Sequence, residues 1–189
     1  MRPPRRACVA RVAFAAAILL AGCAPKPDPT RLLIDEVLET HAAHELDEPA
    51  RHLVAEALLA AEAEFGVPAL LLLALIERES RFDPRARGAL NARGLMQVRP
   101  ATARAMAVQL EIVLEDSEDL FDARTNIRLG TAYLARMHER FDDWNLALTA
   151  FNVGPTRLRQ LQAQRPMASS RYSRHILARY EAWQASLAE

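Results

Sequence analysis

A run of apolar residues from Leu70 to Ile76 predicts a helix that is buried on every side. Because seven consecutive apolar residues cover all faces of two helical turns, no face of this segment suits the surface of the molecule. Glu77, Arg78 and Glu79 end the apolar run, and Asp83-Pro84 predicts the end of the helix. Counting back from Glu79 in steps of four reaches Leu75 and Leu71, so Glu79 is expected to project from a buried stripe.

The rest of the chain also has helical periodicity, and no segment alternates as a strand would. Thr30 and Asp47 are predicted N-caps, and Asp142 or Asp143 and Ser169 or Ser170 are predicted to cap later helices. A turn is expected at 119–122. The predicted helices span residues 31–46, 48–65, 68–82, 126–140, 144–151 and 155–164, another begins with residues 100–107, and a terminal helix starts at Ser169 or Ser170. The pattern indicates an all-α fold.

Residues 1–22 have the organisation of an export signal. Four arginines lie near the start, and Val12 to Leu20 is an apolar stretch too short to span a bilayer comfortably. Small residues directly before Cys23 resemble the lipobox of bacterial lipoproteins, in which the cysteine is acylated. We therefore predict lipidation of Cys23. An ordinary cleavable signal, or an uncleaved anchor, is the alternative.

The residues after this signal agree with an anchored domain. Cys8 would leave with the signal, so Cys23 would be the one cysteine of the mature chain. Residues 23–30 are rich in proline and predict an extended tether. Ala24 is not aspartate, which by resemblance to lipoprotein sorting signals of Gram-negative bacteria favours the outer membrane. We expect the domain at the periplasmic face of the cell envelope, held to the membrane through Cys23.

Composition and charge narrow the possible partners. The chain has 24 basic and 24 acidic residues, and loss of four arginines with residues 1–22 would leave a formal charge of about −4. No basic stripe or aromatic platform is present, so we expect no nucleic-acid partner. His41, His44 and His52 alternate between faces without a matching acidic pattern, so no metal or other cofactor is predicted.

The position of Glu79 suits a general acid. Burial at the end of an apolar stripe disfavours the charged form of a carboxyl, which raises its pKa and keeps it protonated near neutral pH. A protonated carboxyl can give its proton to the oxygen of a sugar linkage. The alternative is a structural helix-end carboxylate paired with an arginine such as Arg81.

Four short motifs stand in order along the chain: IERES at 76–80, RGLMQVRPATA at 93–103, TAFNVGP at 149–155 and RYSRHI at 171–176. Their order and spacing resemble the catalytic domain of soluble-type lytic transglycosylases, helical enzymes related to goose-type lysozyme that cleave the glycan strands of bacterial peptidoglycan. The resemblance implies a lysozyme-like helical domain with a cleft over residues 55–189, after a helical extension over 31–54.

The resemblance implies that Glu79 is the only catalytic acid/base. Protonated Glu79 would donate to the glycosidic oxygen as the bond to N-acetylmuramic acid breaks. Its carboxylate would then take a proton from the C6 hydroxyl of that sugar, which attacks C1 and closes a 1,6-anhydro ring. No second carboxylate is needed if the acetamido group of the substrate stabilises C1. The substrate-binding residues implied are Ser80, Met96, Gln97, Phe151, Asn152 and Tyr172.

Individual roles follow from the chemistry of these side chains. Gly94 would allow a tight turn that points Met96 and Gln97 into the cleft, Met96 as an apolar floor and Gln97 as donor and acceptor for an N-acetyl group. Core packing is the alternative for Met96. Asn152 would bind substrate or brace the turn after it, with a helix C-terminal cap as its alternative. Tyr172 would bring a phenol to the catalytic acid.

Two regions depart from the family pattern. Phe151 stands where the family usually has tyrosine, so a hydroxyl is missing. Gly88 stands where relatives often have a substrate-binding serine, and Asn91 stands where glycine is usual, although asparagine tolerates a positive φ. These departures leave a peptidoglycan-binding lipoprotein without activity as an alternative to a lytic transglycosylase. A hydrolytic lysozyme on the same fold is a second alternative, because it would use the same acid with water in place of the C6 hydroxyl.

Overall fold

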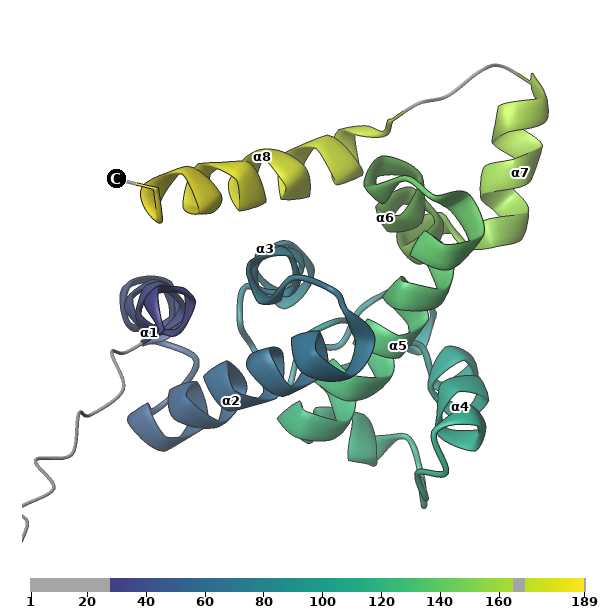
Figure 1. Ribbon diagram of the computed structural model, residues 1–189. Coiled ribbons are helices and arrows are strands. Elements are labelled where there is room, and N and C mark those ends of the chain that lie inside the picture. Colours follow the sequence, from purple (N-terminus) through teal and green to yellow (C-terminus); the bar gives the residue numbers. More distant parts are fainter. Residues whose placement is uncertain (1–27, 165–168, 189) are drawn as a thin grey trace, which may run out of the picture.

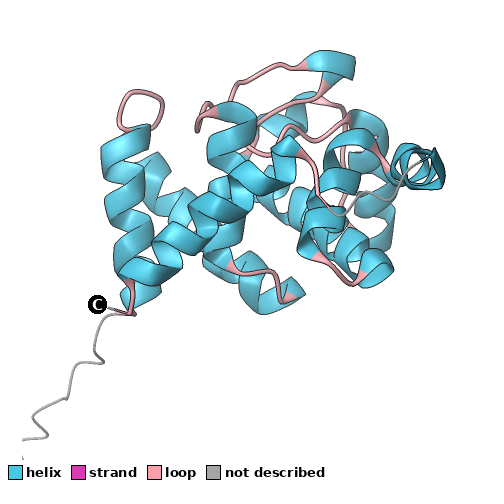
Figure 2. Cartoon of the chain, turned by 90° about the horizontal axis from the view of Figure 1, so that it is seen from above, coloured by secondary structure: helices cyan, strands magenta, loops and turns pink. Residues whose placement is uncertain are grey.

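The computed structural model describes residues 28–164 and 169–188. The predicted export signal, Cys23 and most of the predicted tether lie outside the described residues. Within them the chain is built of helices and loops, without a β-strand, as Figure 2 shows. The helices are α1 (Pro29–Ala42), α2 (Glu48–Phe65), α3 (Ala69–Ser80), α4 (Pro100–Gln109), α5 (Ala123–Phe141), α6 (Trp144–Val153), α7 (Pro155–Gln164) and α8 (Arg171–Ser186), with short 3-10 turns η1 (Ala89–Asn91) and η2 (Glu118–Phe121).

Side-chain caps explain where several helices begin. Asp47, Asp143 and Ser170 cap α2, α6 and α8, as the sequence predicts. The prediction of Thr30 as the first N-cap is wrong. The carboxylate of Asp28 accepts a hydrogen bond from the backbone N–H of Thr30 at 3.0 Å, and Pro29 takes the first helical position, where its missing N–H costs nothing.

The apolar helix α3 lies at the centre of the fold, and residues 69–76 are all buried. Figure 1 shows α3 almost end-on beneath α8, with α1 beside it and α2 below. The helix ends at Ser80, earlier than Asp83-Pro84 would require, because Arg81 and Phe82 both adopt a left-handed conformation. This turn sends Phe82 back into the core, where it is 1% exposed.

Helix α5 is the second helix around which the others pack. It contacts α2, α4 and α6, and its inward face carries Ile127, Leu129, Leu134 and Met137, as the periodicity predicts. It begins at Ala123, earlier than the predicted Asn126, because Asp122 caps it. Across the described parts of the chain, no helix combines the length and apolar character needed to cross a membrane.

Candidate active site

A cleft of about 170 Å³ opens between the end of α3, the loop before α4, and helices α5 and α6. Among the described residues that line it, Glu79 is the one acid. The lining residues are Glu79, Ala89, Ala92, Gln97, Val98, Arg99, Thr102, Tyr133, Phe151, Asn152 and Gly154. Segments far apart in the sequence therefore meet around one carboxyl group.

Glu79 occupies the last turn of α3 and is partly buried at the cleft wall. Its Oε1 accepts a hydrogen bond from the hydroxyl of Tyr172, and no ion pair with Arg81 forms among the described residues. Burial raises the pKa of Glu79, while the hydrogen bond from Tyr172 and the charges of Arg78 and Arg99 partly oppose that rise. The net effect favours the protonated form, as a general acid requires.

The N-terminus of α8 fixes Tyr172. Ser170 and Ser173 form a capping box, in which each side chain bonds the backbone N–H of the other residue at 3.0 Å. The hydroxyl of Thr149 on α6 lies 3.0 Å from that of Ser170, which ties the two helices together. Burial and the neighbouring Glu79 raise the pKa of the Tyr172 phenol well above its usual range, so the phenol stays protonated and donates a hydrogen bond to Glu79.

Replacing Tyr172 with phenylalanine should shift the pH dependence of activity. The hydrogen bond from Tyr172 lowers the pKa of Glu79, so its loss lets that pKa rise further. Glu79 then stays protonated to higher pH, and the alkaline limb of kcat/KM moves upward. We also expect kcat to fall about tenfold, because the carboxyl loses the bond that orients it. An alkaline limb at the same pH in Tyr172→Phe and in the matched Tyr180→Phe variant would contradict this role.

The loop that carries Gln97 turns at Gly94, where φ is +73°. A Cβ at this position would lie 2.2 Å from the backbone oxygen of Leu120, so only glycine fits. The Nε2 of Gln97 donates to the backbone oxygens of Ala86 and Gly94, at 3.1 and 2.9 Å. Since both amide hydrogens are used within the loop, Gln97 offers the cleft its Oε1 acceptor alone.

Met96 does not face the cleft, so this part of the sequence prediction is wrong and the packing alternative holds. Its side chain is 0% exposed and lies against Gly130 of α5, where an added Cβ would come within 2.6 Å of the Met96 sulfur. Ser80 also fails to line the cleft, because its hydroxyl donates to the backbone oxygen of Ile76 within α3.

Asn126 of α5, which the sequence analysis did not single out, holds the loop that carries Met96 and Gln97 through buried hydrogen bonds. Its side chain is fully buried and accepts from the N–H of Met96 at 2.8 Å. It donates to the backbone oxygens of Arg93 and Leu120 at 2.8 and 2.7 Å. An asparagine on the inward, largely apolar face of this helix was the available signal, because buried amides require partners.

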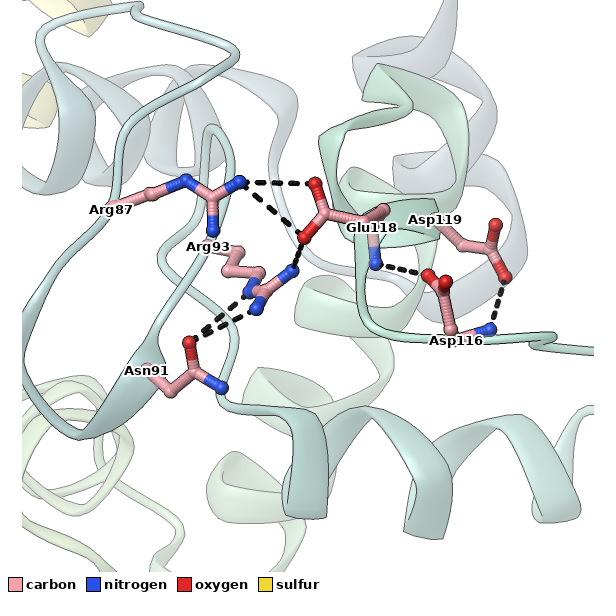
Figure 3. A network of polar contacts seen from close by, with 6 residues as sticks. All are labelled: Arg87, Asn91, Arg93, Asp116, Glu118 and Asp119. Carbon is pink, nitrogen blue, oxygen red and sulfur yellow. Dashed lines mark hydrogen bonds and ion pairs between the residues drawn. The ribbon is translucent and has the colours of Figure 1, made fainter.

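A polar network secures the outer side of the same loop (Figure 3). Glu118 accepts hydrogen bonds from both Arg87 and Arg93, and Arg93 also donates to the side chain of Asn91. Asn91 adopts φ of +63°, the left-handed conformation that the sequence analysis considered tolerable for asparagine. The cleft wall is thus attached to η2 on one side and to α5 on the other.

Phe151 and Asn152 line the cleft at the end of α6, as expected. Gly154 caps that helix through its own backbone N–H, so the capping alternative for Asn152 is not supported. Tyr133 packs on Phe151 with ring centroids 5.5 Å apart and lines the cleft, although its sequence pattern had placed it in the core. A phenol therefore remains near the position where Phe151 lacks a hydroxyl.

Gly88 proves to be a packing position as well as a departure from the family pattern. A Cβ at Gly88 would lie 2.1 Å from Oε1 of Gln97, so any side chain there would displace the Gln97 amide.

Arg99 and Thr102, at the start of α4, line the cleft and were not anticipated. Their side chains follow the Gly-Leu-Met-Gln turn directly, and nothing in their local pattern distinguishes them from ordinary helix-start residues.

Comparisons with known proteins agree with this architecture. The chain is 39% identical over 101 residues to membrane-bound lytic murein transglycosylase F 2 of Alkalilimnicola ehrlichii, covering 50% of this chain and 20% of that protein. It is 33% identical over 95 residues to soluble lytic murein transglycosylase of Escherichia coli K12, covering 49% of this chain and 15% of that protein. The matches thus span a fifth or less of these relatives.

A solved structure also resembles the fold. An inactive mutant of lytic transglycosylase Slt from Pseudomonas aeruginosa superimposes with a TM-score of 0.64 and 28% identity, covering 70% of this chain and 24% of that chain. The family model described as the transglycosylase SLT domain matches residues 56–173, more than half of the chain. The chain therefore belongs to the transglycosylase SLT domain family.

Proposed function

We propose that this protein is a lytic transglycosylase of peptidoglycan, with Glu79 as its only acid/base. The observation that carries the proposal is a partly buried carboxyl with a raised pKa, the one acid among the described residues that line a cleft between α3, α5 and α6. The names of the relatives, lytic murein transglycosylases, support the substrate. The inactive Pseudomonas aeruginosa mutant carries a glutamate-to-glutamine substitution, which supports dependence on one carboxyl in a relative.

The proposed reaction uses the two protonation states of Glu79 in turn. The protonated carboxyl donates to the glycosidic oxygen between N-acetylmuramic acid and N-acetylglucosamine, and the C1–O bond breaks. The carboxylate then takes the proton of the C6 hydroxyl, the O6–C1 bond forms, and Glu79 is again protonated. Tyr172 holds Oε1 of Glu79, so Oε2 is the oxygen left to exchange protons with substrate.

A single carboxyl is sufficient for this reaction. Glycosidases that act through their own carboxylate nucleophile need a second acid about 5 Å from the first, and the described cleft lining contains none. Positive charge at C1 is instead stabilised by the acetamido group of the substrate. Gln97 lines the cleft and its Nε2 is already bonded within the loop, so in this proposal its Oε1 accepts a hydrogen bond from that acetamide N–H.

We further propose that the protein acts at the cell envelope through a lipid on Cys23 and a tether over residues 23–30, most simply at the outer membrane. The relatives include membrane-bound and soluble lytic transglycosylases, which supports the envelope. Metabolic labelling with a radioactive fatty acid tests the anchor: the wild type should incorporate label, and Cys23→Ala should not. Label in both variants would rule out acylation at this cysteine.

The test of the activity is mass spectrometry of the fragments that residues 24–189 release from purified peptidoglycan. We expect fragments that end in 1,6-anhydro-N-acetylmuramic acid. Fragments with reducing ends would mean that water attacks C1 and would make the protein a lysozyme. Binding to peptidoglycan without release of fragments would contradict an enzyme and favour the non-catalytic alternative that the departures at Phe151 and Gly88 suggested.

A further inference from the structure

Two exposed apolar side chains stand on different walls of the candidate active-site cleft. Leu90 belongs to η1, in the loop before α4, and is 71% exposed, while Val153 is the last residue of α6 and is 36% exposed. Ala89, directly before Leu90, lines the cleft. Asn152 and Gly154, on either side of Val153, line it too. We call Leu90 and Val153 the apolar rim.

The cleft is small for the ligand that the proposed function assigns to it. Its volume is about 170 Å³. Pockets that enclose a small ligand usually measure about 300–1,000 Å³. The cleft can therefore enclose only a part of a glycan strand, and the sugars beside the scissile linkage have to pass over its edge. Residues at that edge are in a position to contact them.

The backbone of Leu90 argues against an incidental surface residue. A single exposed apolar side chain is ordinary. Leu90, however, also has φ of +56° and ψ of 30°, a left-handed conformation that a leucine disfavours. The loop imposes this conformation, because the N–H of Gly88 donates to the oxygen of Ala92 at 2.9 Å and the N–H of Ala92 donates to that of Ala89 at 3.2 Å.

Stability alone would place another residue at position 90. Glycine or asparagine would suit the left-handed backbone, and asparagine would also suit the contact with water. Strained residues of this kind concentrate where a protein contacts its ligands. The leucine is therefore explained by an apolar surface that covers it when a ligand is bound.

We propose that the apolar rim binds the sugars beside the scissile linkage, and that Leu90 and Val153 pack on their C–H faces and acetamide methyl groups. This inference rests on the proposed function, because it takes a glycan strand as the ligand. Every sugar of the strand carries these apolar groups, whether or not a peptide is attached to it. The rim would thus act equally on peptide-bearing and peptide-free strands.

Replacing Leu90 with asparagine should move substrate binding and stability in opposite directions. The variant loses the apolar contact, so we expect KM to rise about fivefold on both kinds of strand. The kcat should not change, because the contact lies away from the reacting atoms and is made equally in the ground state. Asparagine tolerates the left-handed backbone, so Tm should rise by about 2 °C. Leu90→Met keeps an apolar side chain and should keep the wild-type KM.

The second rim residue and a control complete this series. Val153→Ala removes a smaller exposed surface, so its KM should rise about twofold. The double variant with Leu90→Asn should show about a tenfold rise, because independent contacts on different walls add in free energy. Val108→Asn changes an 82% exposed valine of α4 that does not line the cleft, and its KM should equal that of the wild type.

Three results would overturn the proposal. One is an unchanged KM in Leu90→Asn. Another is a KM that rises on peptide-bearing strands alone, because the contact would then be with the peptide. The third is a fall of Tm together with the rise of KM, because Leu90 would then act through the fold of the loop.

Binding of the N-acetylglucosamine tetramer tests the rim without catalysis. This probe carries the same C–H faces and acetamide methyl groups, and it has neither a lactyl group nor a peptide. In calorimetry, Leu90→Asn should weaken its binding about fivefold, and Val108→Asn should not. Equal binding by the two variants and the wild type, or none by the wild type, would refute the proposal. If the wild type cleaved no strand but bound the tetramer through Leu90, the proposed function alone would fail.

Discussion

Replacing Glu79 with glutamine is expected to reduce the rate of fragment release from peptidoglycan about a thousandfold. Glutamine keeps the shape of the side chain and can still accept the hydrogen bond from Tyr172, but it has no proton to give to the glycosidic oxygen. It also cannot take the proton of the C6 hydroxyl, so both halves of the reaction fail. The measurement is the initial rate of fragment release, followed by chromatography, with binding to peptidoglycan measured in parallel and expected to persist.

The thermal stability of Glu79→Gln shows whether its loss of activity comes from the missing proton donor or from unfolding. The folded wild type holds the Glu79 proton above the ordinary pKa of 4.5, while the unfolded chain releases it there. Wild-type stability therefore declines as pH rises from that value through the folded pKa, and the variant lacks this decline. Its Tm at neutral pH should equal or exceed that of the wild type. Glu64→Gln, on the exposed side of α2, is the matched control and should keep full activity.

Replacing Asn126 with alanine should give the largest loss of stability among single changes near the cleft. It would leave three buried backbone groups without partners: the N–H of Met96 and the oxygens of Arg93 and Leu120. Each such group costs about 1–3 kcal/mol, so we expect the free energy of unfolding to fall by about 3 kcal/mol or more. Denaturation in urea, followed by circular dichroism, measures it.

Two further variants separate the hydrogen bonds of Asn126 from its volume. Asn126→Asp keeps the shape and one acceptor but offers no donor to the two oxygens, so it should be nearly as unstable as the alanine variant. Asn145→Ala removes a partly buried amide on α6 whose side chain has no hydrogen bond among the described residues, and it should change stability by less than about 0.5 kcal/mol. A similar loss in Asn126→Ala and Asn145→Ala would argue against this account.

The order of the helices could be predicted because strong local signals agree. Prolines near helix starts, aspartate and serine caps, and the unbroken apolar run of α3 each determine structure within a few residues. Helix boundaries were less predictable where two residues could act as the cap, or where a turn depends on tertiary contacts. Asp28 rather than Thr30 begins α1, and left-handed Arg81 and Phe82 end α3 before Asp83. Burial of Phe82, a tertiary effect, decides the second case.

The candidate site could be predicted in its chemistry but only partly in its geometry. The periodicity of α3 was enough to place Glu79 on a buried stripe, and the late tyrosine proved to be its hydrogen-bond donor. The orientation of Met96 depends on contacts with Asn126 and Gly130, which lie 30 and 34 residues away in the sequence. Such long-range contacts leave no local pattern, so a motif resemblance cannot decide which of its residues face the substrate.

The hydrogen bond between Tyr172 and Glu79 joins residues 93 positions apart in the chain. During synthesis, every described residue that lines the cleft, from Glu79 to Gly154, emerges before Tyr172 does. A growing or clipped chain can therefore contain the acid and the cleft while lacking the phenol that orients the acid. Since Tyr172 belongs to α8, full activity depends on the docking of that late helix. The proposed activity would thus be delayed until folding is nearly complete.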